Sequence, residues 1–473
     1  MTHLNELQRI ASISNGTRAI NTVGFNRTID YLTDYLSAYT DFKITKNFFP
    51  VTDFVLTQTP ILHTSIEESI TNHTYSMDNS VTEFRVAHYS GAANFSNFIP
   101  MTVIPNAGCL VADWLAAAPP ATGRVVLVKR GQCSFIETSA LAAKFNVSAI
   151  LFYNDGTSST RMEPMSVYLG PNNSIPVLSL SFNLGERLVS ATRISANNVG
   201  VLLSISLIDN KPVPVSNICA DTSTGDPTRT IVIGSHSDSV RSGPGINDNG
   251  SGSAAILALA TTLARLFRTS AYTKYEYRIR FCWWGAEELG LFGSEFHVAQ
   301  ARNSTIVGER LTDYLAYLNF DMLGSPNFRF GIYDARTAQN DTLQSAVSAS
   351  FKISEMFREW FIAQNLPWDY IEFEYGSDYV AFLMDDIPVG GLFSGANEIK
   401  TQEERDRYDE SLGQGQGGLA NIFHDPCYHQ MCDSIQNINV LGYKKMVQAA
   451  AYAIESLARK SDLKAWLYSK KDI

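Results

Sequence analysis

The sequence predicts an α/β protein in which helices flank a mixed, mostly parallel sheet, with a small β-rich domain inserted into the chain. From Asn217 onward, apolar strand-like runs alternate with helical segments, which is typical of a layered domain around a largely parallel sheet. Between Phe84 and Ile208, short β-branched runs recur between turn signals and indicate a separate β-rich unit. The 473 residues are also too many for one small core. We therefore expect residues 1–83 and 213–473 to form the main domain and residues 84–212 to form the insert.

The elements are expected in the following order. Two helices with apolar faces lie within residues 1–40. In the insert, strands are predicted at 101–104, 125–128, 149–153, 177–180 and 201–208, with short helices near 136–145 and 184–190. In the main domain, strands are predicted at 218–221, 231–234, 277–283, 314–319, 328–332 and 390–393. Helices are predicted there at 252–266, 288–302, 343–364, 379–383 and 440–460.

The composition indicates an ordered globular protein that binds neither nucleic acid nor a membrane. Hydrophobic residues make up 45% of the chain, and the formal net charge is −10. A negative charge of this size disfavours binding to nucleic acid or to an anionic membrane. The most apolar helical segment, residues 254–266, is interrupted by Thr261, Thr262 and Arg265, so no membrane span is predicted. The sequence makes no prediction of an oligomeric state.

Several features predict a secreted chain or one delivered to a vacuolar or lysosomal lumen. Asn-x-Ser/Thr sequons, the acceptors of N-glycosylation, occur at Asn15, Asn26, Asn72, Asn94, Asn146, Asn172, Asn249, Asn303 and Asn340. The first residues, MTHLNELQRI, lack the pattern of a signal peptide, which fits either a cytosolic protein or a mature segment whose signal peptide is not part of this sequence. Because of the sequons and the six cysteines, we expect the mature segment.

The chain has six cysteines, namely Cys109, Cys133, Cys219, Cys282, Cys427 and Cys432. The last two flank YHQM, and the first two bracket one strand region. In a secreted chain these two pairs are expected to form disulfides, whereas in the cytosol the CxxxxC spacing would bind metal or have no role. The middle two, Cys219 and Cys282, lie in apolar strand-like runs, and we expect both to be buried free thiols.

Histidines and carboxylates collect after the predicted strands of the main domain. The stretch TIVIGSHSDSVRSGPGINDNGSG contains an apolar run that ends in His236 and Asp238, followed by a loop with one acid, Asp248. The other candidates follow later strands or lie in a Cys-bracketed loop: Glu287, Glu288, Asp321 and His429. Each alone has an ordinary explanation, because adjacent glutamates are also favoured at exposed helix N-termini. Their joint occurrence at the carboxyl ends of the strands indicates a metal centre.

This set of side chains matches the needs of two Zn²⁺ ions. Two histidines and three carboxylates suffice if one carboxylate bridges the ions, and the remaining acid is then free to act as a base. Two cations about 3.5–4 Å apart acidify a water molecule and polarise a carbonyl group. We interpret Asp238 as an acceptor that orients the imidazole of His236, with a solvated loop acid as the alternative. His424 is not expected to be a ligand.

The motifs around these residues resemble those of the co-catalytic zinc aminopeptidases. In order they read GSHSDS, GINDNGSG, WWGAEELGLFGS, NFDM, GSDYVAF, IPVGGLFSGA and DPCYHQMCD, between Gly234 and Asp433. The resemblance implies the zinc exopeptidase fold, a mixed sheet flanked by helices. It also implies five zinc ligands, with one ion held by His236 and Asp321, the other by Glu288 and His429, and both by the bridging Asp248.

The same resemblance implies roles for two further residues and for the local backbone. Glu287 is the implied general base, and Tyr428 the implied stabiliser of the oxyanion. A cis peptide bond is implied between Asp248 and Asn249. The disulfide Cys427–Cys432 is implied to stiffen the loop that carries the last ligand.

The insert resembles a protease-associated domain. GC at 108–109, VVLVKRGQCSF at 125–135 and AILFYND at 149–155 carry the likeness, which implies a disulfide between Cys109 and Cys133. The insert shows no catalytic set. We expect it to shape access to the site or to bind partners, with structural packing as the alternative.

The predicted function is that of a zinc-dependent aminopeptidase acting on peptides with a free N-terminus. A glutamate-carboxypeptidase-like exopeptidase is one alternative, but it needs a basic pocket for a C-terminal carboxylate, and no arginine cluster accompanies the motifs. A catalytically inactive, receptor-like binding protein is another, although all five ligand positions and Glu287 are present. A single-zinc cyclase of the same superfamily would use fewer ligands.

Overall fold

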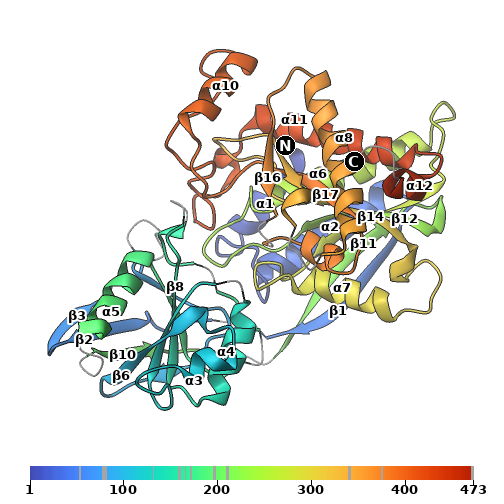
Figure 1. The fold of residues 1–473 in the computed structure, drawn as a ribbon. Helices are drawn as coiled ribbons and strands as arrows, with labels where there is room; N and C mark the ends of the chain where they lie inside the picture. Colours follow the sequence, from blue (N-terminus) through green and yellow to red (C-terminus); the bar gives the residue numbers. More distant parts are fainter. Residues whose placement is uncertain are drawn as a thin grey trace. The chain divides into compact units, whose positions relative to one another are not determined.

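The computed structural model describes residues 1–52, 55–76, 82–131, 133–157, 161–165, 167–170, 173–194, 199–208, 212–338, 342–373 and 376–469. The chain divides into two compact units, a main unit of Met1–Val51 with Val213–Ile473 and an insert of Thr52–Pro212 (Figure 1). The sequence analysis placed the start of the insert at residue 84. In the structure the insert begins earlier, because two strands that precede residue 84 belong to its sheet. Strand β2 Ile61–Ile66 pairs with β10 Val199–Ile205, and β3 Ser69–Asn72 pairs with β2.

The main unit is built on one mixed sheet with the strand order β1-β11-β13-β12-β14-β17-β15-β16. Its strands are β1 Lys43–Val51, β11 Val213–Asp221, β12 Asp226–His236, β13 Tyr277–Trp284, β14 Tyr314–Phe320, β15 Gly331–Asp334, β16 Asp369–Glu372 and β17 Val389–Phe393. The middle of the sheet, β13-β12-β14-β17, is parallel, and β11 and β15 pair with it in the antiparallel sense. The predicted fold class is confirmed.

Strand β1 carries the chain into the insert, and β11 receives it on the way back. The two strands pair antiparallel along their whole length, and Val51 stands directly opposite Val213. The insert therefore leaves and rejoins the main unit at one end of a single strand pair.

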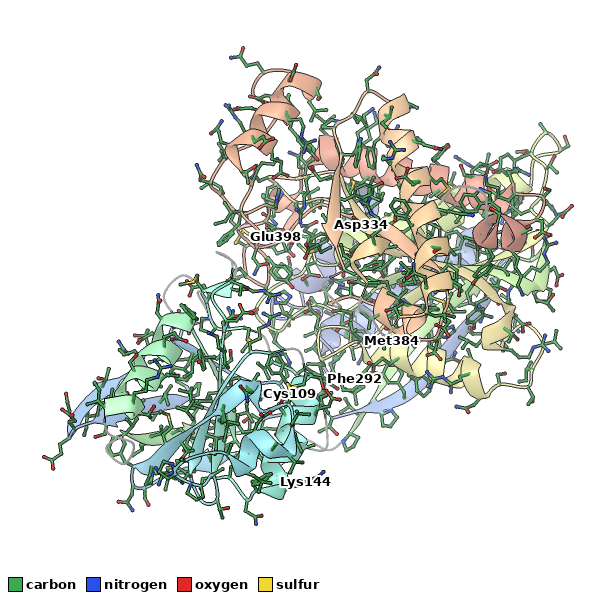
Figure 2. All side chains as sticks on the ribbon, in the orientation of Figure 1. Cys109, Lys144, Phe292, Asp334, Met384 and Glu398 are labelled. Carbon is green, nitrogen blue, oxygen red and sulfur yellow. A yellow bond between two sulfur atoms is a disulfide. The ribbon has the colours of Figure 1, made fainter. Side chains whose placement is uncertain are left out.

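Helices cover both faces of the main sheet (Figure 1). They are α1 Thr2–Ser12, α2 Val23–Tyr39, α6 Gly250–Phe267, α7 Phe292–Asn303, α8 Gln344–Ala363, α9 Tyr379–Leu383, α10 Gln402–Leu412, α11 Val440–Ala458 and α12 Leu463–Tyr468. Because side chains alternate along a strand, Ile231 and Ile233 of β12 join the hydrophobic core that includes α1, α2, α6 and α11. Val232 joins the core on the other face, with α7 and α9. In both units, side chains fill the space between the helices and the sheet (Figure 2).

Helix α6 is long and largely apolar. By length and composition it is a candidate membrane span, but 67% of it is buried inside the protein. It packs against β12, α1 and α2, which is the environment of a core helix. Burial of this helix explains its composition.

The prediction of free thiols at Cys219 and Cys282 is wrong, because the two residues form a disulfide. They lie on neighbouring antiparallel strands, β11 and β13, and stand directly opposite each other with Cα atoms 4.2 Å apart. The sequence analysis placed both strands but did not predict that they are neighbours. The predicted pairs Cys109–Cys133 and Cys427–Cys432 are both present.

Some element boundaries differ from the predicted ones. Helix α7 begins at Phe292 rather than at residue 288, because Gly290 and Leu291 have positive φ angles of 121° and 63° and interrupt a helix at that point. Glu287 and Glu288 therefore remain in the loop after β13. Strand β15 begins at Gly331 rather than at residue 328, and β16, α10 and α12 were not predicted.

The insert contains one sheet with helices packed against it. The strand order is β3-β2-β10-β6-β7-β8-β9-β4, and β5 pairs with β10. The remaining strands are β4 Phe84–Val86, β5 Ala93–Asn94, β6 Ile99–Ile104, β7 Val125–Lys129, β8 Ala149–Tyr153 and β9 Val177–Leu180. The helices are α3 Val111–Leu115, α4 Phe135–Lys144 and α5 Phe182–Ile194. The β-rich insert with local helices is confirmed.

Candidate metal centre

The predicted site residues meet at the carboxyl ends of the parallel strands. His236 is the last residue of β12 and lies opposite Trp284, the last residue of β13. Glu287 and Glu288 follow β13, and Asp321 follows directly after β14. Strand termination in a parallel sheet thus brings groups far apart in the sequence to one edge.

Asp248 lies between the two histidines. Its Oδ1 atom is 3.2 Å from Nε2 of His236, and its Oδ2 atom is 3.1 Å from Nε2 of His429. Each imidazole also faces a second carboxylate: Nε2 of His236 lies 3.4 Å from Oδ1 of Asp321, and Nε2 of His429 lies 3.1 Å from Oε2 of Glu288. The structure therefore contains two adjacent histidine–carboxylate groups that share one carboxylate.

Glu287 stands beside the first of these groups. Its Oε2 atom is 3.8 Å from Nε2 of His236, farther than the oxygens of Asp248 and Asp321. Only 9% of Glu287 is exposed, so the two adjacent glutamates are not solvent-facing acids at a helix N-terminus. Both glutamates face the site, and the predicted set of residues is brought together in full.

These residues fit a divalent metal ion. Two sets have ligand atoms that all lie within 4.8 Å of one another, namely His236, Glu287 and Asp321, and His236, Asp248 and Glu288. Among the described residues, the buried oxygens Oε1 of Glu288 and Oδ1 of Asp321 have no hydrogen-bond partner. Unpartnered buried carboxylate oxygens are costly unless a cation approaches them, and imidazole with carboxylate is a common donor set for zinc.

Asp238 supports the site through the backbone. Its two carboxylate oxygens accept hydrogen bonds from the N–H groups of Glu287 and Glu288 at 3.2 Å and 3.3 Å. Its Oδ1 atom lies 3.6 Å from Nδ1 of His236, which is an ion-pair distance rather than a hydrogen bond. Asp238 is 1% exposed, so it is not a solvated loop acid.

The segment around Asp248 is held by hydrogen bonds of Asp433 and Asn249, and the sequence analysis gave neither residue this role. Asp433 accepts hydrogen bonds from the backbone N–H groups of Asn247 and Asp248 at 2.8 Å and 3.0 Å. The side chain of Asn249 accepts from the N–H of Met322 and donates to the carbonyl of Phe320, which ties α6 to the end of β14. The expected cis peptide bond between Asp248 and Asn249 is present.

Two further residues were missed. Ser377 donates a 2.6 Å hydrogen bond to Oδ2 of Asp321, and Arg18 lies buried behind the loops that carry His236 and Asp248. Ser377 belongs to the GSDYVAF motif, so a sequence signal for it existed. Arg18 lies in an unremarkable loop of the N-terminal region, where the sequence alone gives no signal.

The last ligand candidate lies in a short constrained loop. The disulfide Cys427–Cys432 closes the loop, and His429 has a positive φ of 59°. The rings of Tyr428 and His429 stack with their centroids 3.8 Å apart, and Oγ of Ser242 donates to the carbonyl of His429 at 2.8 Å. The loop thus holds the two rings face to face, and burial together with the charges of Asp248 and Glu288 raises the pKa of Tyr428 well above its usual value.

The site holds strongly perturbed acids and bases. Burial raises the pKa of Glu287 well above its usual value. Burial opposes ionisation of Asp248 as well, but its contacts with His236 and His429 outweigh this effect and lower its pKa. Burial would lower the pKa of His429, yet the charges of Glu288 and Asp248 raise it to about 10. The carboxylates therefore create a strong local preference for positive charge.

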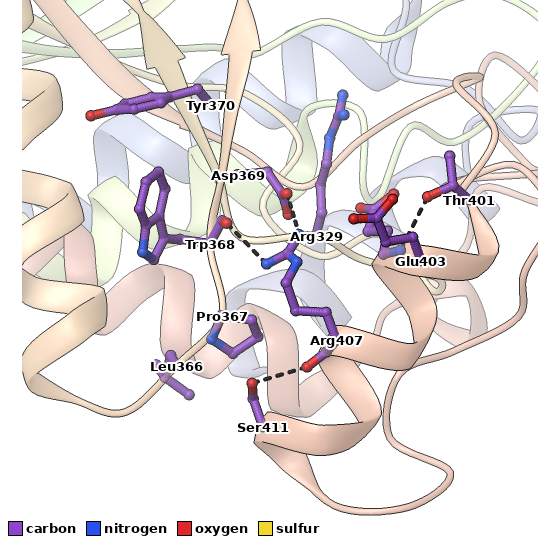
Figure 3. A pocket seen from close by; sticks show the side chains of 11 residues that line it. Arg329, Leu366, Pro367, Trp368, Asp369, Tyr370, Thr401, Glu403, Arg407 and Ser411 are labelled. Carbon is purple, nitrogen blue, oxygen red and sulfur yellow. Dashed lines mark hydrogen bonds and ion pairs between the residues drawn. The ribbon is translucent and has the colours of Figure 1, made fainter.

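Two further features lie outside the site. His424 is buried, with Nδ1 2.9 Å from the carbonyl oxygen of Asn327 and Nε2 3.6 Å from Oε1 of Glu404, so it is not a ligand of the centre. A cavity of about 610 Å³ lies between β16 and α10, with Trp368, Asp369 and Arg407 among its lining residues (Figure 3). None of the predicted site residues lines this cavity.

Comparison with known proteins assigns the family. The sequence pattern of peptidase family M28 matches residues 217–454, which include every predicted ligand. The chain belongs to peptidase family M28. A second pattern, the PA domain, matches residues 97–188 within the insert. These matches confirm the predicted enzyme class, a metallopeptidase of the aminopeptidase type. They also confirm the predicted protease-associated insert.

Two curated relatives and one solved structure align with most of the chain. An aminopeptidase of Pseudomonas aeruginosa is 32% identical over 92% of this chain and 76% of its own length. Leucine aminopeptidase 2 of Trichophyton rubrum is 36% identical over 76% of this chain and 66% of its own length. An aminopeptidase from Aneurinibacillus sp. strain AM-1 has a similar structure, with a TM-score of 0.69, 18% identity, and coverage of 98% of this chain and 94% of its own.

Proposed function

We propose that this M28 peptidase is an aminopeptidase that uses two zinc ions to remove the N-terminal residue of peptides. The observation that carries the proposal is the position of Asp248, whose two oxygens face the two histidine Nε2 atoms at 3.2 Å and 3.1 Å. Such a carboxylate is suited to bridge two ions, one held with His236 and Asp321 and the other with Glu288 and His429. The curated relatives named aminopeptidases support the choice of substrate.

When bound, the zinc ions supply Lewis acidity, which acidifies a water molecule and polarises the scissile carbonyl. Glu287 takes a proton from the attacking water and passes it to the leaving amine. Burial raises the pKa of Glu287, which makes its carboxylate a stronger proton acceptor. The hydroxyl of Tyr428 donates to the oxyanion that forms on the carbonyl. The carboxylates of Glu287 and Asp321 attract the positively charged N-terminus of the substrate.

The proposal is tested by metal content and by a pair of substrates. We expect about two zinc ions per chain by elemental analysis, and hydrolysis of a neutral aminoacyl amide in preference to a dipeptide with an acidic C-terminal residue. Preference for the acidic dipeptide would favour a carboxypeptidase instead. A folded sample without bound metal would favour an inactive binding protein.

We also propose that the protein works in an oxidising compartment, either outside the cell or in a vacuolar or lysosomal lumen. Three disulfides support this, and no cysteine among the described residues is free. The sequon residues on the surface are Asn15, Asn26, Asn72, Asn94, Asn146 and Asn303, whereas Asn249 is buried. Asn172 and Asn340 lie outside the described residues.

A further inference from the structure

Arg18 is an arginine with no exposed surface, in the connection between α1 and α2. Its guanidinium donates to three backbone carbonyl groups: Nη1 to Ser237 at 2.6 Å, Nη2 to Gly245 at 2.5 Å, and Nε to Pro244 at 2.9 Å. Among the described residues, it forms no ion pair with a carboxylate within 4.0 Å. A fully buried arginine usually has such a partner, so its role needs another explanation.

The three carbonyl groups belong to the two ends of the loop that carries the metal ligands. Ser237 directly follows His236, and Gly245 precedes Asp248 by three residues. The planar guanidinium presents its donors in a fixed fork, so it sets the distance between these two backbone segments. Arg18 thereby connects the segment of the first histidine to the segment of the bridging carboxylate.

The surroundings of Gly245 leave little freedom for this connection. Gly245 has a φ of +59°, and a Cβ atom there would lie 2.2 Å from the carbonyl oxygen of Asp248 and 3.2 Å from Nη2 of Arg18. The segment of residues 17–20 adds further contacts, since Oγ1 of Thr17 donates to the carbonyl of Val240 at 2.8 Å. The backbone between the two ligands is therefore packed directly against Arg18.

Carboxylates that make no ion pair with Arg18 still stabilise its positive charge. Burial lowers its pKa, and the carboxylates of Asp238, Asp433, Asp248 and Glu288 counteract this by favouring the charged form. As a charge alone, Arg18 would repel a metal cation, because like charges oppose each other in a buried site. Any contribution to metal binding must therefore come from the geometry that it imposes.

We propose that Arg18 is a positioning residue for the metal centre, one that holds the His236 and Asp248 segments at the separation that metal binding requires. The inference rests on the proposed two-zinc function and adds a residue from outside the stretch matched by the M28 pattern, which begins at residue 217. Without the guanidinium group, the two segments can move apart. Metal binding must then also bring the ligands back together, which weakens the affinity. Residues that orient metal ligands typically contribute about 10–100-fold to metal affinity.

The test measures zinc affinity rather than activity. The metal-free full-length chain is titrated with zinc against a chromophoric chelator, for the wild type, Arg18→Lys and Arg18→Met. Lysine keeps the positive charge but lacks the fork, so we expect both variants to bind zinc about 10–100-fold more weakly. If Arg18→Met does not fold, Arg18→Lys alone decides the question.

Arg280→Lys is the matched control. Arg280 is also buried, at 2% exposure, and pairs with Asp221 and Glu309 in the middle of β13, about 13 Å along the strand from Trp284. We expect this variant to be less stable but to bind zinc like the wild type. Equal weakening of zinc binding in Arg18→Lys and Arg280→Lys would overturn the inference in favour of general destabilisation.

Two other outcomes also decide against it. If Arg18→Lys binds zinc as tightly as the wild type, the guanidinium fork is not needed and Arg18 acts only as a charge. This conclusion holds whether or not Arg18→Met binds zinc more tightly. A wild-type protein that binds no zinc would overturn the proposed function itself, and the inference with it.

Discussion

Glu287 and Glu288 are adjacent, and the structure assigns them to different positions in the site. Oε2 of Glu288 lies 3.1 Å from Nε2 of His429, in contact with the proposed ligand set, whereas Oε2 of Glu287 stands 3.8 Å from Nε2 of His236. Both backbone N–H groups are held by Asp238. The same substitution at the two positions, glutamate to glutamine, should therefore remove different functions.

Glu287→Gln keeps the shape of the side chain and leaves all five proposed ligands intact. We expect it to retain two zinc ions while kcat falls by about 10²–10⁴, which is the usual contribution of a general base. In free energy this is about 3–5 kcal/mol of transition-state stabilisation. The folded state should not suffer, because the variant removes a buried carboxyl group whose pKa burial has raised.

Glu288→Gln, the matched variant, should lose zinc. An amide is a poorer zinc ligand than a carboxylate, so we expect a lower zinc content and a loss of turnover that added zinc partly restores. The assays are elemental analysis of the purified variants and turnover of an aminoacyl amide with and without added zinc. Near-normal turnover of Glu287→Gln would refute the assignment of the base. Equal zinc loss in both variants would make Glu287 a ligand, as its distance from Asp321 and His236 allows.

Three further predictions concern a buried histidine, the backbone around Asp248 and a disulfide. Burial lowers the pKa of His424 from 6.5 to about 4, so its neutral form contributes stability that is fully present above pH 6.5 and is lost as the pH falls through 4. Urea unfolding should show that the wild type loses up to about 3 kcal/mol more than His424→Gln over this range. Asp433→Asn should weaken zinc binding by about 10–100-fold, measured by chelator competition, because it disturbs the hydrogen bonds that Asp433 accepts from the backbone N–H groups of Asn247 and Asp248. Replacing Cys219 and Cys282 by alanine should lower the free energy of unfolding by about 4 kcal/mol, since that disulfide spans 63 residues.

Each of these has a clear opposing result. Parallel stability–pH curves for the wild type and His424→Gln would contradict the first. Unchanged zinc affinity in Asp433→Asn would contradict the second. Titratable thiols in the denatured, unreduced wild type would contradict the third, because they would show that the disulfide is not formed.

Part of the proposed ligand set could be predicted because parallel strands end at a common edge. The sequence predicts a strand before each of His236, Glu287 and Asp321. If these strands are parallel neighbours, the three residues lie at the same edge of the sheet. His429 was different, since its position depends on a loop far along the chain, and only the resemblance to a family linked it to the others. Local strand patterns thus predicted part of the site, and motif order supplied the rest.

What was missed depends on pairings and contacts that no local pattern encodes. The disulfide of Cys219 follows from the antiparallel pairing of β11 with β13, which periodicity cannot reveal. Helix α10 has an almost wholly polar surface and buries only Tyr408, so it lacks an apolar stripe; its Thr401-x-x-Glu404 start was the available signal. Arg18 contacts backbone carbonyl groups more than two hundred residues away, and nothing in its own neighbourhood indicates this.

The pairing of Val51 with Val213 makes the whole span from 52 to 212 equivalent to the loop of a β-hairpin. Opposed residues in such a ladder lie about 5 Å apart, so a tight two-residue turn can bridge them. A deletion that joins these strands through Asn-Gly would preserve every hydrogen bond of the ladder and leave the proposed zinc ligands in place. Zinc retained by the shortened chain would show that the main unit folds independently of the insert.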